Sequence, residues 1–250
     1  MKKVFIITMA LCVSIFGNLF SASLDFDDLV NKLQKTYVEP FAKDIGSVLA
    51  GGMSHSGRTL GLVPGVDVGV GASLSTKPSS DNVILKNSIG EKLFGMPFIQ
   101  LSKGLPMNID IVLRGFPETQ GIQVLGFGLK YGIIQKELAA VSLGLSAMYS
   151  YNSLTYDTFK ANVNSLSGMI SLKIPMIEPY IGISIDSTKL ETDFTIAQLP
   201  AGVQNLSVTT TQPKYVAGIN LSLIPLTYIN IGATYLIDHI GADIGIGIKF

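Results

Sequence analysis

The chain has 250 residues, a formal net charge of zero, 14% charged residues and 26 glycines. Its mean hydropathy of +0.43 is high for a water-soluble protein, yet after the first residues no stretch holds the roughly eighteen unbroken apolar residues of a spanning helix. Near neutrality argues against nucleic acid as a partner, and the single cysteine, Cys12, excludes a disulfide framework.

Residues 1–23 have the features of a secretory signal peptide. Lys2 and Lys3 precede an apolar run from Val4 to Phe16, and small residues at 21–23 suit a signal peptidase. We expect cleavage after Ser23, which would export the chain and remove its cysteine. The alternative is an N-terminal membrane anchor, although the run is short and polar residues interrupt it.

Residues 24–64 form a separate segment in which apolar residues recur at helical spacing. Pro40 is expected to interrupt the helix, a second helical stretch to restart there, and Gly51 and Gly52 to end it. The candidate buried side chains of this segment are Phe26, Leu29, Leu33, Tyr37, Phe41 and Ile45. The segment either plugs a barrel formed by the residues after it or rests beneath that barrel in the periplasm.

From Gly65 onward the sequence alternates between apolar residues and small or polar ones, beginning with Val66–Ser75. A period of two indicates strands whose two faces meet different environments, and about ten residues is the length of a tilted strand that crosses a bilayer. About ten strands can be counted. Eight or twelve are alternatives, because 96–102 is short and the stretch after Thr76 could hold an extra strand.

The links between these strands are predicted to alternate in length. Short links are expected at 103–106, 134–137, 175–179 and 224–226, and longer ones at 76–95, 152–158 and 198–212. Outer-membrane barrels have short periplasmic turns and longer outer loops. We therefore predict an all-β fold, a transmembrane antiparallel up-and-down β-barrel over residues 65–250, in the bacterial outer membrane and in contact with its lipid. A secreted β-sandwich is the remaining alternative.

The closing stretch Gly241–Phe250 places five apolar residues on one face and ends on an aromatic residue. It is similar to the last strand of bacterial outer-membrane barrels. This resemblance implies that the barrel-assembly machinery recognises the end of the chain, with Phe250 as the assembly signal.

A second resemblance lies at the other end. Tyr37-Val38-Glu39-Pro40-Phe41-Ala42, followed by a small-residue run at 46–57 and a first strand, resembles the amino-terminal block of a poorly characterised family of Gram-negative outer-membrane barrels with an N-terminal helical plug. That family is loosely similar to the long-chain fatty-acid transporter class, whose Asn-Pro-Ala motif is missing here. The resemblance implies a plugged channel, transporter or binding protein for a small, hydrophobic solute. The alternative is a non-conducting barrel whose loops 76–95 and 198–212 meet a partner.

Many inward positions of the predicted strands are Gly or Ser, which would leave room for a plug. Charged residues at inward positions are the candidate lumen-lining residues: Asp67, Asp110, Arg114, Lys130, Lys173, Asp186, Asp243 and Lys249. Pairing within the lumen is the favoured role for them over tuning passage. His55 and His239 are isolated in the sequence, so we expect no metal site, no cofactor and no catalytic residue.

Overall fold

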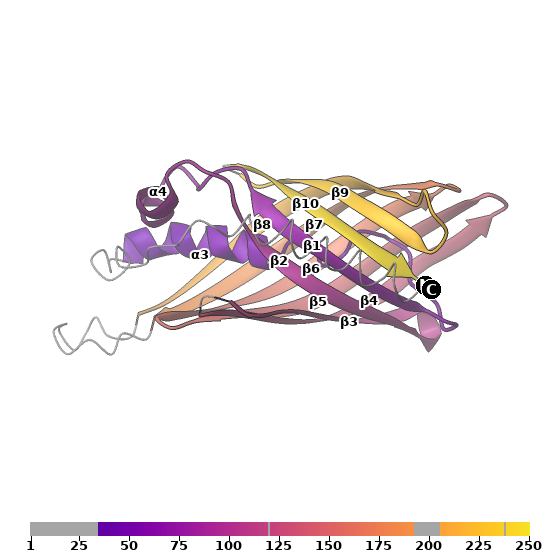
Figure 1. Cartoon of the computed structure of the whole chain (residues 1–250), viewed down its shortest axis with the longest axis horizontal. Coiled ribbons are helices and arrows are strands. Elements are labelled where there is room, and N and C mark those ends of the chain that lie inside the picture. Colours follow the sequence, from indigo (N-terminus) through magenta and orange to yellow (C-terminus); the bar gives the residue numbers. More distant parts are fainter. Residues whose placement is uncertain (1–34, 120, 193–205, 238) are drawn as a thin grey trace.

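Ten strands close into one antiparallel barrel in the part of the chain that this computed structural model describes, residues 35–119, 121–192, 206–237 and 239–250. The strands are β1 (Val66–Ser75), β2 (Phe94–Leu105), β3 (Ile109–Thr119), β4 (Ile122–Leu138), β5 (Val141–Tyr156), β6 (Phe159–Lys173), β7 (Ile177–Thr192), β8 (Ser207–Leu221), β9 (Thr227–Tyr235) and β10 (Ile240–Lys249). The predicted fold class and the count of ten are confirmed (Figure 1).

Sequential strands pair with their neighbours, and the barrel closes between β1 and β10. Asp67 lies opposite Lys249, and Ser75 lies opposite Gly241. Backbone hydrogen bonds between Val66 and Phe250, N···O 2.8 and 3.3 Å, extend the closure to the last residue. With every edge paired, the barrel leaves no row of unsatisfied backbone groups facing lipid.

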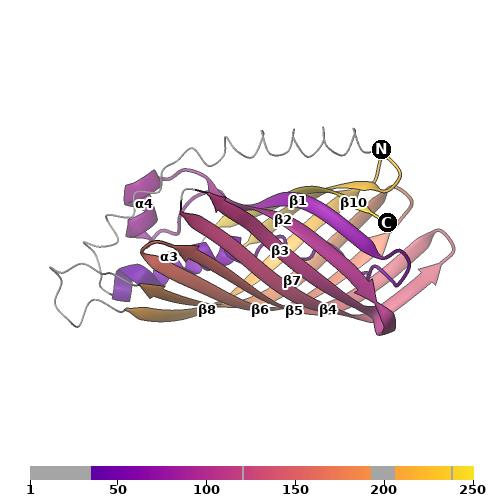
Figure 2. The same cartoon turned by 60° about the horizontal axis from the view of Figure 1, so that its bottom comes forward.

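The barrel has two different ends (Figure 2). At the turn mouth lie Phe250 and the short links 106–108, 139–140, 174–176 and 222–226. At the loop mouth lie the link 76–93, which contains the helix α4 (Val83–Ile89), the link 157–158 and the described part of the β9–β10 link. No helix in the described residues is long and apolar enough to cross a membrane.

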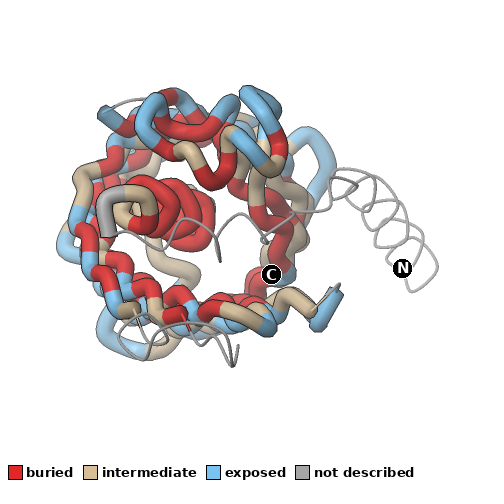
Figure 3. Tube along the Cα trace, turned by 90° about the vertical axis from the view of Figure 1, so that its left-hand side faces the viewer, coloured by how far each residue is buried: buried red, intermediate tan, exposed pale blue. Residues whose placement is uncertain are grey.

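The helix α3 (Lys35–Leu49) lies inside the ring of strands, against one side of the wall (Figure 3). It packs on β1, β2 and β5–β8. Pro40 does not interrupt it, so the prediction of two helical stretches is wrong. The predicted signal peptide and the plug candidates Phe26, Leu29 and Leu33 fall outside the described residues.

Several predicted loops were wrong because the strands are longer than expected. β4 runs through the expected link at 134–137 with a bulge between Gly132 and Ile134. β5 and β6 leave only residues 157–158 between them, and β8 takes up 207–212. The stretch after Thr76 holds the helix α4 and no extra strand, and β2 begins at Phe94.

The strands keep the period of two along their length, but the polarity of their faces inverts near the loop mouth. Around the middle and turn end of the barrel, exposed outward residues are apolar: Leu113, Leu125, Leu129, Leu166, Ile181, Ile183, Ile185, Ile229 and Ile231. Near the loop mouth the outward residues are polar, among them Thr155, Lys160, Lys189, Thr209 and Thr211. There the inward residues are apolar and fully buried: Leu154, Ala161, Leu190 and Val208. The barrel thus projects beyond its apolar belt.

Tyrosines lie at the level where the outward residues change from apolar to polar. Tyr149 and Tyr151 donate hydrogen bonds to the outward Asn164 and Asn162 at 2.6 and 2.8 Å. Tyr215 and Tyr235 pair across β8 and β9 with ring centroids 6.5 Å apart. Amphipathic rings at such a boundary are typical of the girdle of membrane barrels, which supports lipid contact over the belt.

Candidate functional site: the occupied lumen and the cavity at the turn mouth

Residues 35–64, called the lumenal segment below, run through the barrel from the loop mouth to the turn mouth. α3 occupies the half near the loop mouth, and residues 50–64 continue through turns and bends to the start of β1. The two halves meet different surroundings, apolar around α3 and polar around residues 50–64.

Around α3 the interior is an apolar core. Its buried residues Val38, Phe41, Ala42, Ile45, Val48 and Leu49 recur three and four apart, as one helix face requires. Phe41 meets Phe159 of β6 edge to face, with ring centroids 5.4 Å apart. Gly46 approaches β7 so closely that a Cβ there would overlap the side chain of Thr188. Tyr37 is partly buried against the same core.

A buried polar cluster joins α3 to the loop mouth. The carboxylate of Asp44 accepts hydrogen bonds from Ser79 N at 2.9 Å, from Asn82 Nδ2 at 2.7 Å and from the Ser79 hydroxyl. Asn82 also caps α4 by accepting from Leu85 N at 3.0 Å. His239, which is isolated in the sequence, lies in the β9–β10 link with its Nδ1 3.3 Å from Ser79 Oγ. Side chains from two links thereby hold one helix.

Along residues 50–64 the wall supplies side chains that satisfy the backbone of the segment. Arg114 donates to Gly51 O at 2.7 Å, and Lys130 donates to the carbonyls of Ser56 and Arg58 at 2.7 and 2.6 Å. Asn220 donates to His55 O at 2.7 Å, and Gln100 donates to Met53 O at 3.3 Å. Buried backbone groups need such partners, so the wall fixes the course of residues 50–64.

Glycines also allow the wall and the lumenal segment to approach each other closely. A Cβ on Gly144 of β5 would overlap the backbone at Gly57 and Arg58, and one on Gly57 would overlap the backbone at Gly144. This contact requires glycine on both sides. Part of the remaining space left by inward glycines is filled by tyrosine, since Tyr228 lies against Gly247 and Tyr180 against Gly218.

All eight predicted lumen-lining residues lie on the inner side of the wall. Six are buried: Asp67, Asp110, Arg114, Lys130, Asp186 and Asp243; Lys173 and Lys249 are partly exposed at the turn mouth.

The structure brings some of these residues together and separates others. Asp110 lies opposite Lys130 in the β3–β4 register and accepts a hydrogen bond from Leu60 N at 3.0 Å. Asp186 forms an ion pair with Lys214 at 2.8 Å, and Asp67 accepts from the Tyr228 hydroxyl at 2.9 Å. The guanidinium of Arg114 lies 3.9 Å over the Phe98 ring.

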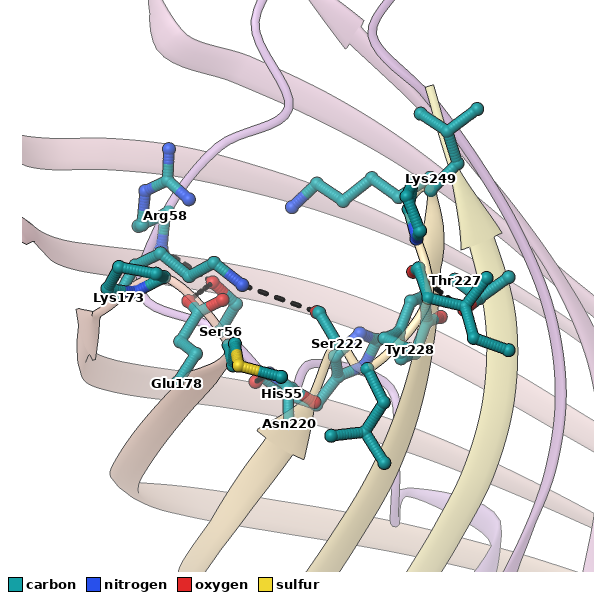
Figure 4. Close-up of a pocket in the computed structure, with 16 residues that line it drawn as sticks. His55, Ser56, Arg58, Lys173, Glu178, Asn220, Ser222, Thr227, Tyr228 and Lys249 are labelled. Atoms are coloured by element: carbon teal, nitrogen blue, oxygen red, sulfur yellow. Dashed lines mark hydrogen bonds between the residues drawn. The ribbon is translucent and has the colours of Figure 1, made fainter. Parts of the chain in front are cut away.

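A cavity of about 460 Å³ lies at the turn mouth between the lumenal segment and the wall. Three cationic side chains line it, Arg58, Lys173 and Lys249. Figure 4 shows Lys249 extending from β10 across the mouth towards the side on which Arg58 and Lys173 lie. Glu178 is its one acidic lining residue, and residues of the turns 174–176 and 222–226 form an apolar rim.

His55 lies on the floor of this cavity, its ring stacked on Tyr228 with centroids 5.0 Å apart. The positive charge of the cavity comes from its two lysines and its arginine. Among the described residues no group of three or more His, Cys, Asp or Glu side chains is placed to hold a metal ion.

Residues 84–250, about two thirds of the chain, match the model of DUF6588, a family of unknown function. The chain belongs to the DUF6588 family. The match begins in α4 and covers β2–β10, whereas α3 and β1 lie before it. No curated protein matches the chain.

Solved barrels similar to this DUF6588 chain share little sequence with it. The N-terminal β-barrel domain of Pseudomonas aeruginosa OprF is 12% identical, with 74% of this chain and 97% of that one covered and a TM-score of 0.34. The KdgM porin is 5% identical, with 74% and 99% covered and a TM-score of 0.37. Neisserial surface protein A is 10% identical, with 74% and 97% covered and a TM-score of 0.32.

Sequence reasoning missed several functional candidates of this DUF6588 barrel. Glu178 falls in the link predicted at 175–179, although it is inward by parity with Tyr180, because Pro179 beside it hides the strand pattern. Lys214 follows directly after the loop predicted at 198–212, and that prediction hides the start of β8. Arg58 precedes the strands and carries no periodicity that could place it.

Proposed function

We propose that the protein is an outer-membrane barrel held closed by its lumenal segment, through which a small solute passes only when that segment is displaced. The membrane part of this proposal is supported by the closed sheet, the apolar outward belt and the tyrosine girdle. In this setting the turn mouth faces the periplasm, the loop mouth faces outward, and β10 with Phe250 is offered to the assembly machinery.

The closed state is inferred from one observation: residues 35–64 fill the lumen from one mouth of the barrel to the other. Deeper than the cavity at the turn mouth, three further cavities hold about 40, 30 and 20 Å³. Such volumes accommodate about one to three water molecules and no solute. Passage therefore requires residues 50–64 to leave their hydrogen bonds with the wall, or α3 to leave its core.

The experiment measures conductance of the full chain in planar bilayers after α3 is unseated. Gly46→Val pushes a side chain into Thr188 of β7 without changing the wall, so the variant should conduct ions and small solutes where the parent chain is closed. Gly168→Val is the matched control, because Gly168 faces outward and a Cβ there meets nothing within 4 Å.

A reversible lock provides the converse test. Ser56 and Ser171 have hydroxyl oxygens 3.5 Å apart, so Ser56→Cys with Ser171→Cys would tie the lumenal segment to β6. Combined with Gly46→Val, the oxidised pair should reduce conductance and a thiol reductant should restore it. If Gly46→Val folds, as judged by heat-dependent mobility in gels, and remains silent to every ion and solute, the barrel is a non-conducting structural protein.

A further inference from the structure

The positive charges at the turn mouth are only partly matched by the protein itself. Among the described residues the side-chain ammonium of Lys249 has no hydrogen-bond or ion-pair partner, whereas its backbone N–H donates to Leu226 O at 2.7 Å. Arg58 faces Glu137 at 3.9 Å, but Glu137 is 81% exposed, so water weakens this pair. Lys173 donates to the neutral Ser222 hydroxyl at 3.3 Å. Each of these cations can therefore bind a further anionic ligand.

The one carboxylate that lines the cavity is already engaged. Glu178 is buried and its Oε1 accepts hydrogen bonds from Ser56 at 2.5 Å and from Ser171 at 2.8 Å. Two deeper carboxylates also have partners. Asp67 accepts a hydrogen bond from the Tyr228 hydroxyl, and Asp110 accepts one from Leu60 N and lies near the charge of Lys130. The lining groups thus carry three positive charges and one negative charge, which leaves an excess of about two positive charges at neutral pH.

We propose that this cavity binds the dianionic phosphate group of a small organic molecule. A phosphate monoester supplies two negative charges and three acceptor oxygens, which fit an arginine and two lysines placed on different elements. Arg58 comes from the lumenal segment, Lys173 from β6 and Lys249 from β10. The cavity of about 460 Å³ is in the size range of small-molecule sites.

The apolar rim suits the organic part of such a ligand. Met176 of one turn and Leu223, Ile224 and Leu226 of another line the cavity and are more than half exposed. A phosphate held by the cations would place its ester substituent against these side chains. A neutral solute would leave the three cations without partners, and a cationic solute would be repelled.

This inference rests on the proposed function for its biological setting, in which the cavity receives a solute at the periplasmic side. Binding itself does not require passage, so the two can fail independently. Phosphate binding without conductance in Gly46→Val would retain the site and remove the transport role. Conductance without phosphate binding would retain the gated barrel and remove the site.

The test is calorimetric titration of the full chain in neutral detergent with glycerol 3-phosphate, with glycerol as the uncharged probe. We expect binding of the phosphate alone, and a loss of affinity of about tenfold or more in both Lys249→Gln and Lys173→Gln, as is usual for a lost hydrogen bond to a charged group. Lys136→Gln is the matched control, since Lys136 is exposed at the same end of the barrel and does not line the cavity.

A second titration separates two sources of the same chemistry. Binding of glycerol 3-phosphate identifies a soluble metabolite, whereas binding of a short-chain phosphatidic acid alone identifies a lipid headgroup. Equal affinity for glycerol and its phosphate, preference for octanoate over both phosphates, or equal losses in the Lys136→Gln control would overturn the proposal. Unchanged heat-dependent mobility of each variant shows that the barrel still folds.

Discussion

Single charged side chains inside this barrel serve mainly as partners for another stretch of the same chain. Lys130 is buried, and its ammonium is bonded to two carbonyl oxygens of the lumenal segment while Asp110 lies across the strand pair. A buried charge is tolerated only with such compensation. The inward charges therefore couple the position of residues 50–64 to the stability of the wall.

Lys130→Met keeps the length of the side chain and removes both hydrogen bonds. We expect a loss of about 3 kcal/mol in the free energy of unfolding, because two carbonyls lose a charged donor and the Asp110 carboxylate loses a nearby positive charge. Chemical denaturation in detergent measures this loss, and proteolysis within residues 50–64 should become faster.

Lys136→Met, at an exposed position on the same strand, serves as the control for Lys130→Met. It should change the free energy of unfolding by less than about 0.5 kcal/mol. Similar stability in the two variants would mean that the bonds from Lys130 to the segment contribute nothing.

At the level of elements, α3 is stable where it lies because the wall around it is apolar. Its helix continues through Pro40, six residues into the element, although proline usually interrupts a helix beyond its first turn. Packing on six strands and the bonds to Asp44 compensate for the hydrogen bond that proline cannot make. The helix is thus held by tertiary contacts more than by its own propensity.

Phe41→Ala tests this packing. Phe41 is fully buried and contacts Phe159, so its truncation should cost about 3–5 kcal/mol of docking free energy and expose α3 to protease. The measurement is the rate of limited proteolysis within residues 35–49 of the folded barrel.

The matched control for Phe41→Ala is Phe127→Ala, in which an outward aromatic residue is removed from the lipid-facing belt. It should leave the proteolysis rate of α3 unchanged. Equal protection of α3 in Phe41→Ala and the parent chain would show that the helix is held by its polar contacts alone.

For the whole molecule, the outward belt determines where the barrel sits in a bilayer. Ile231 lies at the centre of β9, is half exposed, and faces other isoleucines across both neighbouring strands. Below the belt are the short turns, and above it the wall continues as a projection with a polar exterior. One continuous sheet therefore meets lipid at the belt and water along the projection.

Ile231→Arg should destabilise the barrel in vesicles by about 2–4 kcal/mol, the cost of a cation near the bilayer midplane. Ile240→Arg, at the loop end of β10, should cost about 0–1 kcal/mol because the side chain reaches the interface. Folding into lipid vesicles, followed by denaturant titration, measures both. Equal costs at the two positions would contradict the assignment of the belt to lipid.

The sequence alone was sufficient for the strands that cross the belt. In β10 the isoleucines 244, 246 and 248 alternate with glycine and aspartate, and this alternation correctly predicted both the strand and its closure on β1. The same alternation in β3, β4 and β10 predicted inward positions for Asp110, Lys130 and Lys249, because parity along a strand fixes the face of each residue.

What the sequence could not supply was the change of environment along one strand. Near the loop mouth Leu190 and Val208 are inward and Lys189 and Thr209 outward, the reverse of the belt, so stretches with a polar exterior resembled loops. The period of two is a local property of the backbone, whereas the polarity of each face depends on whether lipid, water or α3 lies beside it.

The turn-mouth cavity was likewise decided only by the tertiary structure. Arg58, Lys173 and Lys249 are separated by more than seventy residues from one another in the chain, and nothing in their local sequence links them. The course of residues 50–64 through the lumen and the closure of the barrel bring them to one mouth. Local periodicity determined that this chain forms a barrel, and contacts between distant residues determined what fills it and which charges remain available.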